Sequence, residues 1–163
     1  GILFSGDIAS NILYGNPDGS EEDMKEAATI AQATEFIEAK KKKYQSSISQ
    51  GGSNVSGGQK QRLSIARALV RKPDIYIYDD SFSALDMKTD AVLRQALKPE
   101  VKNAIVIIVA QRVSTIMDAD QILVLDEGRL AASGRHEELL KTCPLYYEIA
   151  ASQLSEEELQ NVC

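Results

Sequence analysis

Apolar residues in the first forty positions recur with the spacing of amphipathic helices. Asp7 precedes a short apolar stretch and is expected to cap a helix from Ile8 to Leu13. Ser20 and Asp23 have the spacing of a capping box, and the apolar residues that follow share one helical face: Met24, Ala27, Ala28 and Ala31. Another helix is expected around residues 35–40. This part of the chain is therefore predicted to contain helices and loops.

Beyond Pro73 the pattern changes to that of strands alternating with helices. Residues 75–78 form a β-prone run, and residues 105–109 form a continuous apolar run, typical of a strand buried on both faces of a parallel sheet. Further strands are expected at 122–125 and near Leu130. Helices are expected around 91–97, 137–140 and 146–154. This alternation predicts an α/β fold with a doubly wound, mostly parallel sheet.

Ligands of such folds bind at the carboxyl ends of the strands. Asp79 and Asp80 follow the first strand, and Gln111 follows the second. By itself the carboxylate pair is equally compatible with a turn, a metal site or a catalytic site.

A polar loop containing two glycines, residues 54–62, leads directly into a helix. Gly57 and Gly58 have no side chains, so their N–H groups can approach an anion at the helix start, and Ser56 can cap that helix. The same residues also fit an ordinary serine-capped helix after a glycine turn. Both interpretations remain open from the loop alone.

Composition narrows the function classes. The 163 residues are 44% hydrophobic, which suffices for one globular domain, and 24 acidic against 18 basic residues argue against a DNA-coating protein. Cys143 and Cys163 have neither disulfide-framework nor metal-site spacing, so a reducing cytosol is expected. The longest apolar run, Ala104 to Ala110, is far below the ~20 residues that span a bilayer.

Several conspicuous residues have plain structural explanations. The basic run Lys40 to Lys43 could contact phosphate or acidic lipid, but a solvated helix end accounts for it better. His136 is expected to begin a helix, and Tyr76 and Tyr78 are expected to pack in the sheet. Residues 155–158 are expected to cap and begin a solvated terminal helix.

In combination, the motifs resemble the nucleotide-binding domain of an ATP-binding cassette (ABC) transporter of the multidrug-exporter type. Residues 55–59 resemble its signature motif, with Val55 in place of the usual leucine. Residues 75–80 resemble the Walker B strand and residues 83–86 the D-loop, and the chain from 114 to 139 resembles the C-terminal half of an exporter domain. The resemblance covers nearly the whole chain.

One family motif is missing. The pattern Gly-x-x-x-x-Gly-Lys-Ser/Thr, the P-loop that holds the phosphates of ATP, does not occur in the sequence. The resemblance implies a fragment that starts after the family's glutamine loop. Residues 1–55 would be the helical subdomain, and residues 56–163 would be the signature helix and the C-terminal half of a P-loop-NTPase-like core.

Two substitutions concern ATP hydrolysis. Asp80 stands where the family has the glutamate that polarises the attacking water, and Gln111 replaces the switch histidine. Glutamine can hydrogen-bond a phosphate but cannot carry positive charge or shuttle a proton. The resemblance therefore implies a heterodimer in which this chain's own ATP site is degenerate.

The remaining roles also follow from the resemblance. Asp79 would hold Mg²⁺ through water, and Ser83 and Asp86 would contact the partner domain. The residues implied to bind the partner's ATP are Ser56, Gly57, Gly58 and Gln59. The partners would be a second, non-identical nucleotide-binding domain and a transmembrane domain, with no nucleic acid, at the cytoplasmic face of the membrane. ATP and Mg²⁺ would be the cofactors.

Two alternatives stay open. ABC-type ATPases that act on DNA share these motifs, although they carry long coiled coils, which this sequence lacks. A nucleotide-binding half that regulates its partner without hydrolysis also fits Asp80 and Gln111.

Overall fold

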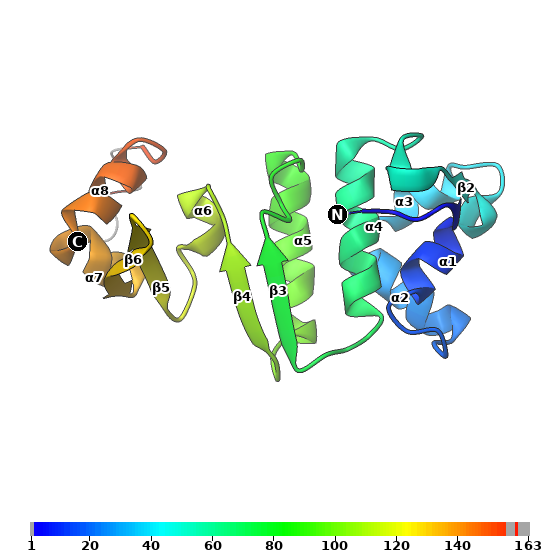
Figure 1. The fold of residues 1–163 in the computed structure, drawn as a ribbon, viewed down its shortest axis with the longest axis horizontal. Coiled ribbons are helices and arrows are strands. Elements are labelled where there is room, and N and C mark those ends of the chain that lie inside the picture. Colours follow the sequence, from blue (N-terminus) through cyan, green and yellow to red (C-terminus); the bar gives the residue numbers. More distant parts are fainter. Residues whose placement is uncertain (1, 156–158, 160–163) are drawn as a thin grey trace. The chain divides into compact units, whose positions relative to one another are not determined.

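The chain folds into two compact units, divided between Val109 and Ala110 (Figure 1). The structure, a computed structural model, describes residues 2–155 and 159. The predicted cap at 155–158 falls mostly outside the described residues. The α/β class expected from the sequence is confirmed, since both units combine helices with small sheets.

The first unit contains helices and short strands up to residue 56, then the long helix α4 and a strand–helix–strand segment. Its elements are β1 (Gly6–Asp7), α1 (Ile8–Leu13), α2 (Glu21–Ile30), α3 (Thr34–Glu38), η1 (Lys43–Gln45), β2 (Ser47–Ile48), η2 (Gln50–Gly52), α4 (Gly57–Leu69), β3 (Ile75–Asp79), α5 (Met87–Glu100) and β4 (Ile105–Val109). The second unit consists of α6 (Val113–Ile116), β5 (Ile122–Asp126), β6 (Arg129–Gly134), α7 (His136–Thr142) and α8 (Pro144–Ala151).

The two predicted helix caps are present. Asp7 accepts a hydrogen bond from the backbone N–H of Ser10 at 2.7 Å, and Ser20 accepts one from the N–H of Asp23 at 3.0 Å. The apolar face predicted for α2 is buried: Met24, Ala27, Ala28 and Ala31. A cap and an apolar face thus fix the start and the orientation of α2.

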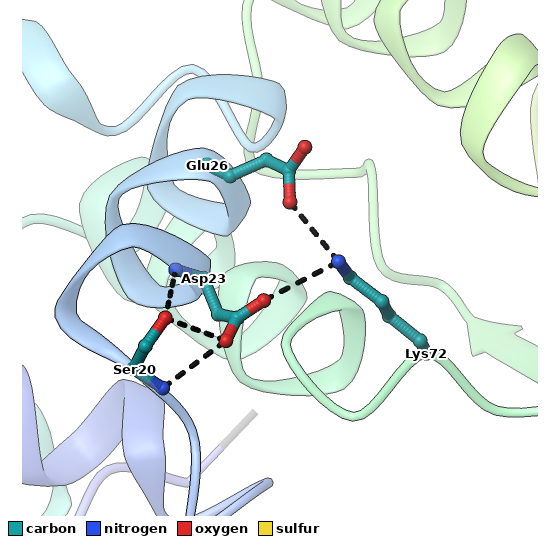
Figure 2. A network of polar contacts seen from close by, with 4 residues as sticks. All are labelled: Ser20, Asp23, Glu26 and Lys72. Atoms are coloured by element: carbon teal, nitrogen blue, oxygen red, sulfur yellow. Dashed lines mark hydrogen bonds and ion pairs between the residues drawn. The ribbon is translucent and has the colours of Figure 1, made fainter.

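The first two turns of α2 are also tied to the chain just beyond α4 (Figure 2). Lys72 Nζ lies 3.3 Å from Asp23 Oδ1 and 3.1 Å from Glu26 Oε2, while the other oxygen of Asp23 accepts from the N–H and hydroxyl of Ser20. These hydrogen bonds lower the pKa of Asp23 and raise that of Lys72. Because these side chains are exposed, water screens both ion pairs, and they add little to the stability of the fold.

Arg67 joins α4 to the N-terminal segment. Its guanidinium donates to the carbonyl of Asn11 and to its side-chain oxygen, each at 2.8 Å, and to the carbonyl of Ile2. It also lies 5.0 Å from the ring centre of Phe4. The core of this unit contains residues on both sides of position 55. The division into a helical subdomain at residue 55 remains a prediction.

Strands β3 and β4 are parallel and pair in register, Ile75 with Ile105 through Asp79 with Val109. Tyr76 and Tyr78 are buried and stacked 6.0 Å apart, which confirms their predicted packing role. The prediction that residues 105–109 are buried on both faces is wrong, since Ile105 is 61% exposed and Ile107 is 47% exposed. Among the described residues β4 pairs with β3 alone, and its apolar side chains are exposed in large part.

The second unit is built on an antiparallel hairpin of β5 and β6, joined by Glu127 and Gly128. Both joining residues have positive φ, the conformation that two-residue hairpin turns require. Since β1 and β2 are also antiparallel, β3–β4 is the only parallel pair among the described strands. Of the mostly parallel sheet that the sequence predicts, the described residues form only the β3–β4 pair.

His136 begins α7, as predicted. It is buried, its Nδ1 lies 2.8 Å from the hydroxyl of Tyr146, and burial lowers its pKa. The pair packs α7 against α8. The basic run of residues 40–43 lies largely on the surface, where Lys43 pairs with Glu38. Over the described residues, no helix is both long and apolar enough to cross a membrane.

Candidate functional site

The polar glycine loop ends at the N-terminus of α4. Ser56 has an extended backbone, its hydroxyl accepts from the N–H of Gln59 at 3.2 Å, and Gln59 Oε1 accepts from the N–H of Ser56 at 3.3 Å. This is a complete capping box. No acidic residue occurs in the first turn, and Ser56 and Gly57 are exposed. The helix therefore presents an accessible, positively polarised end, suited to an anion.

The two glycines of this turn have different surroundings. A Cβ on Gly58 would lie 3.2 Å from the carbonyl oxygen of Ala84, so Gly58 allows α4 to approach the loop after β3. A Cβ on Gly57 would meet the Cβ of Ala84 at 3.7 Å, an ordinary contact. Packing thus explains glycine at 58, whereas at 57 it leaves room for a side chain.

Gln61, a residue that sequence reasoning missed, fastens α4 to the same loop. Its Nε2 donates to the carbonyl of Asp80 and to the hydroxyl of Ser83, both at 3.3 Å, and its Oε1 accepts from the N–H of Ala84 at 3.0 Å. Gln61 lies three residues after Gly58, on the same helical face. That spacing was the available signal. The structure thereby brings the signature residues and the 80–84 loop together.

Residues 81–86 present an outward-facing loop between two buried anchors, Phe82 and Leu85. Ser83 is exposed and its hydroxyl donates to the carbonyl of Asp80 at 3.0 Å. Asp86 is exposed and caps α5, accepting from the hydroxyl of Thr89 at 2.7 Å and from the N–H of Thr89 at 2.9 Å, and these bonds lower its pKa. Asp86 therefore has a structural role that is independent of any partner.

Asp79 and Asp80 lie at the carboxyl end of β3, as predicted. Asp79 ends the strand, and the N–H of Asp80 donates to the carbonyl of Val109 at 2.9 Å, continuing the pairing with β4. Asp80 has φ of +48°, a left-handed conformation that aspartate tolerates better than most residues. Both residues help to line a groove of about 360 Å³ between α4 and β3.

Gln111 belongs to the second unit. It is exposed in the loop between β4 and α6, and its backbone carbonyl accepts a hydrogen bond from Gln153 Nε2 at 3.0 Å. Asp79 and Asp80 therefore share the first unit with the signature loop, whereas Gln111 is part of the second unit.

The described residues contain no cluster of three or more His, Cys, Asp or Glu side chains that could hold a metal ion. Asp79 alone still fits Mg²⁺, which keeps several waters and binds proteins through one or two carboxylates. The α4 N-terminus likewise fits a phosphate group. The residues present therefore suit part of a MgATP site.

Comparison with known proteins identifies the family. The ABC transporter family model matches residues 5–83. An uncharacterised ABC transporter ATP-binding protein of Mycobacterium bovis is 47% identical over 93% of this chain. The chain belongs to the ABC transporter family. An ATP-dependent lipid A-core flippase of Chromobacterium violaceum is 44% identical over 94% of the chain.

A solved structure of an ABC exporter has the same fold as this chain. The structure of a bacterial Atm1-family ABC exporter with ATP bound matches with a TM-score of 0.90 and 39% identity over 95% of the chain. The chain spans only 26% of each of the two relatives and 27% of the exporter chain. Its similarity to these proteins therefore concerns one part of them.

Proposed function

We propose that this chain supplies the signature motif and D-loop to an ATP site whose P-loop belongs to a partner domain, in an ABC exporter. The supporting observation is the exposed, capped start of α4, where Ser56 and Gly57 face solvent and the N–H groups of Gly57 and Gly58 have no intrahelical acceptor. In this proposal those groups, with Gln59, bind the γ-phosphate of the partner's ATP. Donors aimed at developing charge stabilise the transition state of phosphoryl transfer.

Around that site, Ser83 and Asp86 would meet the partner on the loop that Phe82 and Leu85 hold outward. In the chain's own site Asp79 would hold Mg²⁺ through water, Asp80 would stand in for the general base, and Gln111 would contact phosphate. Mg²⁺, when bound, neutralises charge on the transferring phosphate. The partner would be a non-identical half-transporter, and the assembly, with its transmembrane domain, would export a substrate from the cytoplasmic face of the membrane.

A second role is favoured by Asp80 and Gln111. With a shortened carboxylate and an uncharged switch residue, this chain's own site would bind nucleotide and regulate its partner without hydrolysing ATP at an appreciable rate.

The first test concerns nucleotide binding by the 163-residue chain itself. Because the sequence has no P-loop pattern, we expect isothermal titration calorimetry with MgATP to give no binding in the micromolar range. An ABC ATP-binding domain that contains a P-loop, titrated identically, is the control. Micromolar binding by this chain would contradict the proposed division of the site between two chains.

A further inference from the structure

The side-chain amide of Gln153 bridges the backbone on both sides of Arg112. Its Oε1 accepts from the N–H of Val113 at 2.9 Å, and its Nε2 donates to the carbonyl of Gln111 at 3.0 Å. These residues are 40 and 42 positions away in the sequence. One side chain thus holds the peptide groups before and after Arg112, in the loop that contains Gln111.

Both ends of this bridge are anchored. Val113 begins α6, is 2% exposed and belongs to the hydrophobic core of the second unit. Gln153 follows α8, where its own N–H donates to the carbonyl of Ala150 at 3.0 Å, and Ala150 is fully buried. The amide therefore connects two fixed points and leaves little freedom to the loop between them.

The bridge requires the chemistry of glutamine. The N–H of Val113 lies in the first turn of α6, which has no intrahelical acceptor, and Arg112 at the cap position makes no side-chain capping bond. The carbonyl of Gln111 needs a donor instead. A carboxamide offers one acceptor and one donor, whereas a carboxylate offers acceptors only.

We propose that Gln153 is a positioning residue for Gln111 in this chain's own nucleotide site. By fixing the peptide groups at 111 and 113, it sets the direction in which the Gln111 side chain leaves the backbone. This inference rests on the proposed function, in which Gln111 contacts the terminal phosphate of ATP. Removing the bridge lets the loop move, and small displacements of a positioned group have large effects on its interactions.

The bridge itself is tested without nucleotide, by amide hydrogen exchange at Val113 in the 163-residue chain. Gln153→Ala is expected to speed exchange about twofold to tenfold, the effect of losing one hydrogen bond. Gln153→Glu keeps the acceptor and should leave Val113 protected. Ser152→Ala, which removes a neighbouring hydroxyl bonded to the Ile149 carbonyl, is the matched control. Unchanged exchange at Val113 in Gln153→Ala would overturn the bridge.

The positioning role is tested in the full-length, assembled transporter by a photoreactive ATP analogue and its ADP counterpart, crosslinked to this chain. Gln111→Ala is expected to lower the preference for ATP over ADP about tenfold, the effect of losing a hydrogen bond to a charged phosphate. Gln153→Ala should lower the same preference, and the double variant should match Gln111→Ala alone, because Gln153 acts through Gln111.

Two outcomes of this comparison of single and double variants would overturn the inference in different ways. If the effects of the two variants add fully, Gln153 acts independently of Gln111 and is not its positioning residue. If Gln111→Ala leaves the ATP preference unchanged while Val113 remains protected by Gln153, the proposed contact of Gln111 with phosphate fails, and the bridge serves the fold alone.

Discussion

Gly57→Asp is expected to abolish ATP hydrolysis at the partner's site while this chain stays folded. The substitution places a carboxylate at the exposed start of α4, where the proposal puts the γ-phosphate. Two unit charges 4 Å apart repel by about 4 kcal/mol at the effective dielectric near a protein surface, equivalent to about a thousandfold in rate. Site-resolved turnover in the assembled transporter is the measurement.

The structure separates this effect from misfolding. A Cβ at position 57 has an ordinary contact distance of 3.7 Å to Ala84, and a carboxylate in the first helical turn stabilises a helix by about 0.3–1 kcal/mol. The free energy of unfolding should therefore stay within about 1 kcal/mol of the unsubstituted chain. Gly57→Asn, similar in size but uncharged, should lose less activity. Equal losses in both variants, or full activity in Gly57→Asp, would contradict a phosphate at this position.

Asp80→Glu is expected to raise hydrolysis at this chain's own site by roughly 10²-fold in the assembled transporter. The added methylene moves the carboxylate outward by about one bond length, and misplacement of a general base costs on that order. Single-site turnover, with the partner's site inactivated, measures the gain. No turnover with glutamate would show that another element, such as the partner's signature, limits this site.

Backbone conformation does not prevent this substitution. Asp80 has a positive φ of +48°, a conformation that costs most residues roughly 1–2 kcal/mol, but Glu127 adopts the same region at +46°. Asp80→Asn is the matched control, since asparagine tolerates this conformation and lacks the charge. It should show no gain. An equal gain in Asp80→Asn would mean that the carboxylate is not the limiting group.

Local signals in the sequence predicted the local structure well. Asp7, Ser20 and Ser56 each cap the helix that follows, because capping depends on residues only three positions apart. The strand ends at Asp79 and before Gln111 were also correctly located, since apolar runs stop there. These features bring the main candidate residues to the ends of elements.

Contacts between distant segments could not be predicted in this way. The continuous apolar run of β4 suggested burial on both faces, yet Ile105 and Ile107 are exposed, because burial depends on neighbouring layers and not on the strand alone. Gln61 and Gln153 were missed for a related reason. Their amides bond backbone groups 19 to 42 residues away, and although the spacing from Gly58 placed Gln61 on the same helical face, nothing local identifies a partner so distant in the sequence.

The central claim is that this chain lends its signature loop to ATP held by another chain and hydrolyses little ATP itself. Vanadate trapping of a photoreactive nucleotide in the full-length, assembled transporter tests it directly, because the label reports which of the two nucleotide sites has turned over. The account predicts label at the partner's site, where this chain supplies Ser56 to Gln59, and almost none at this chain's own site. Equal labelling of both sites, or labelling of this chain's site alone, would contradict it.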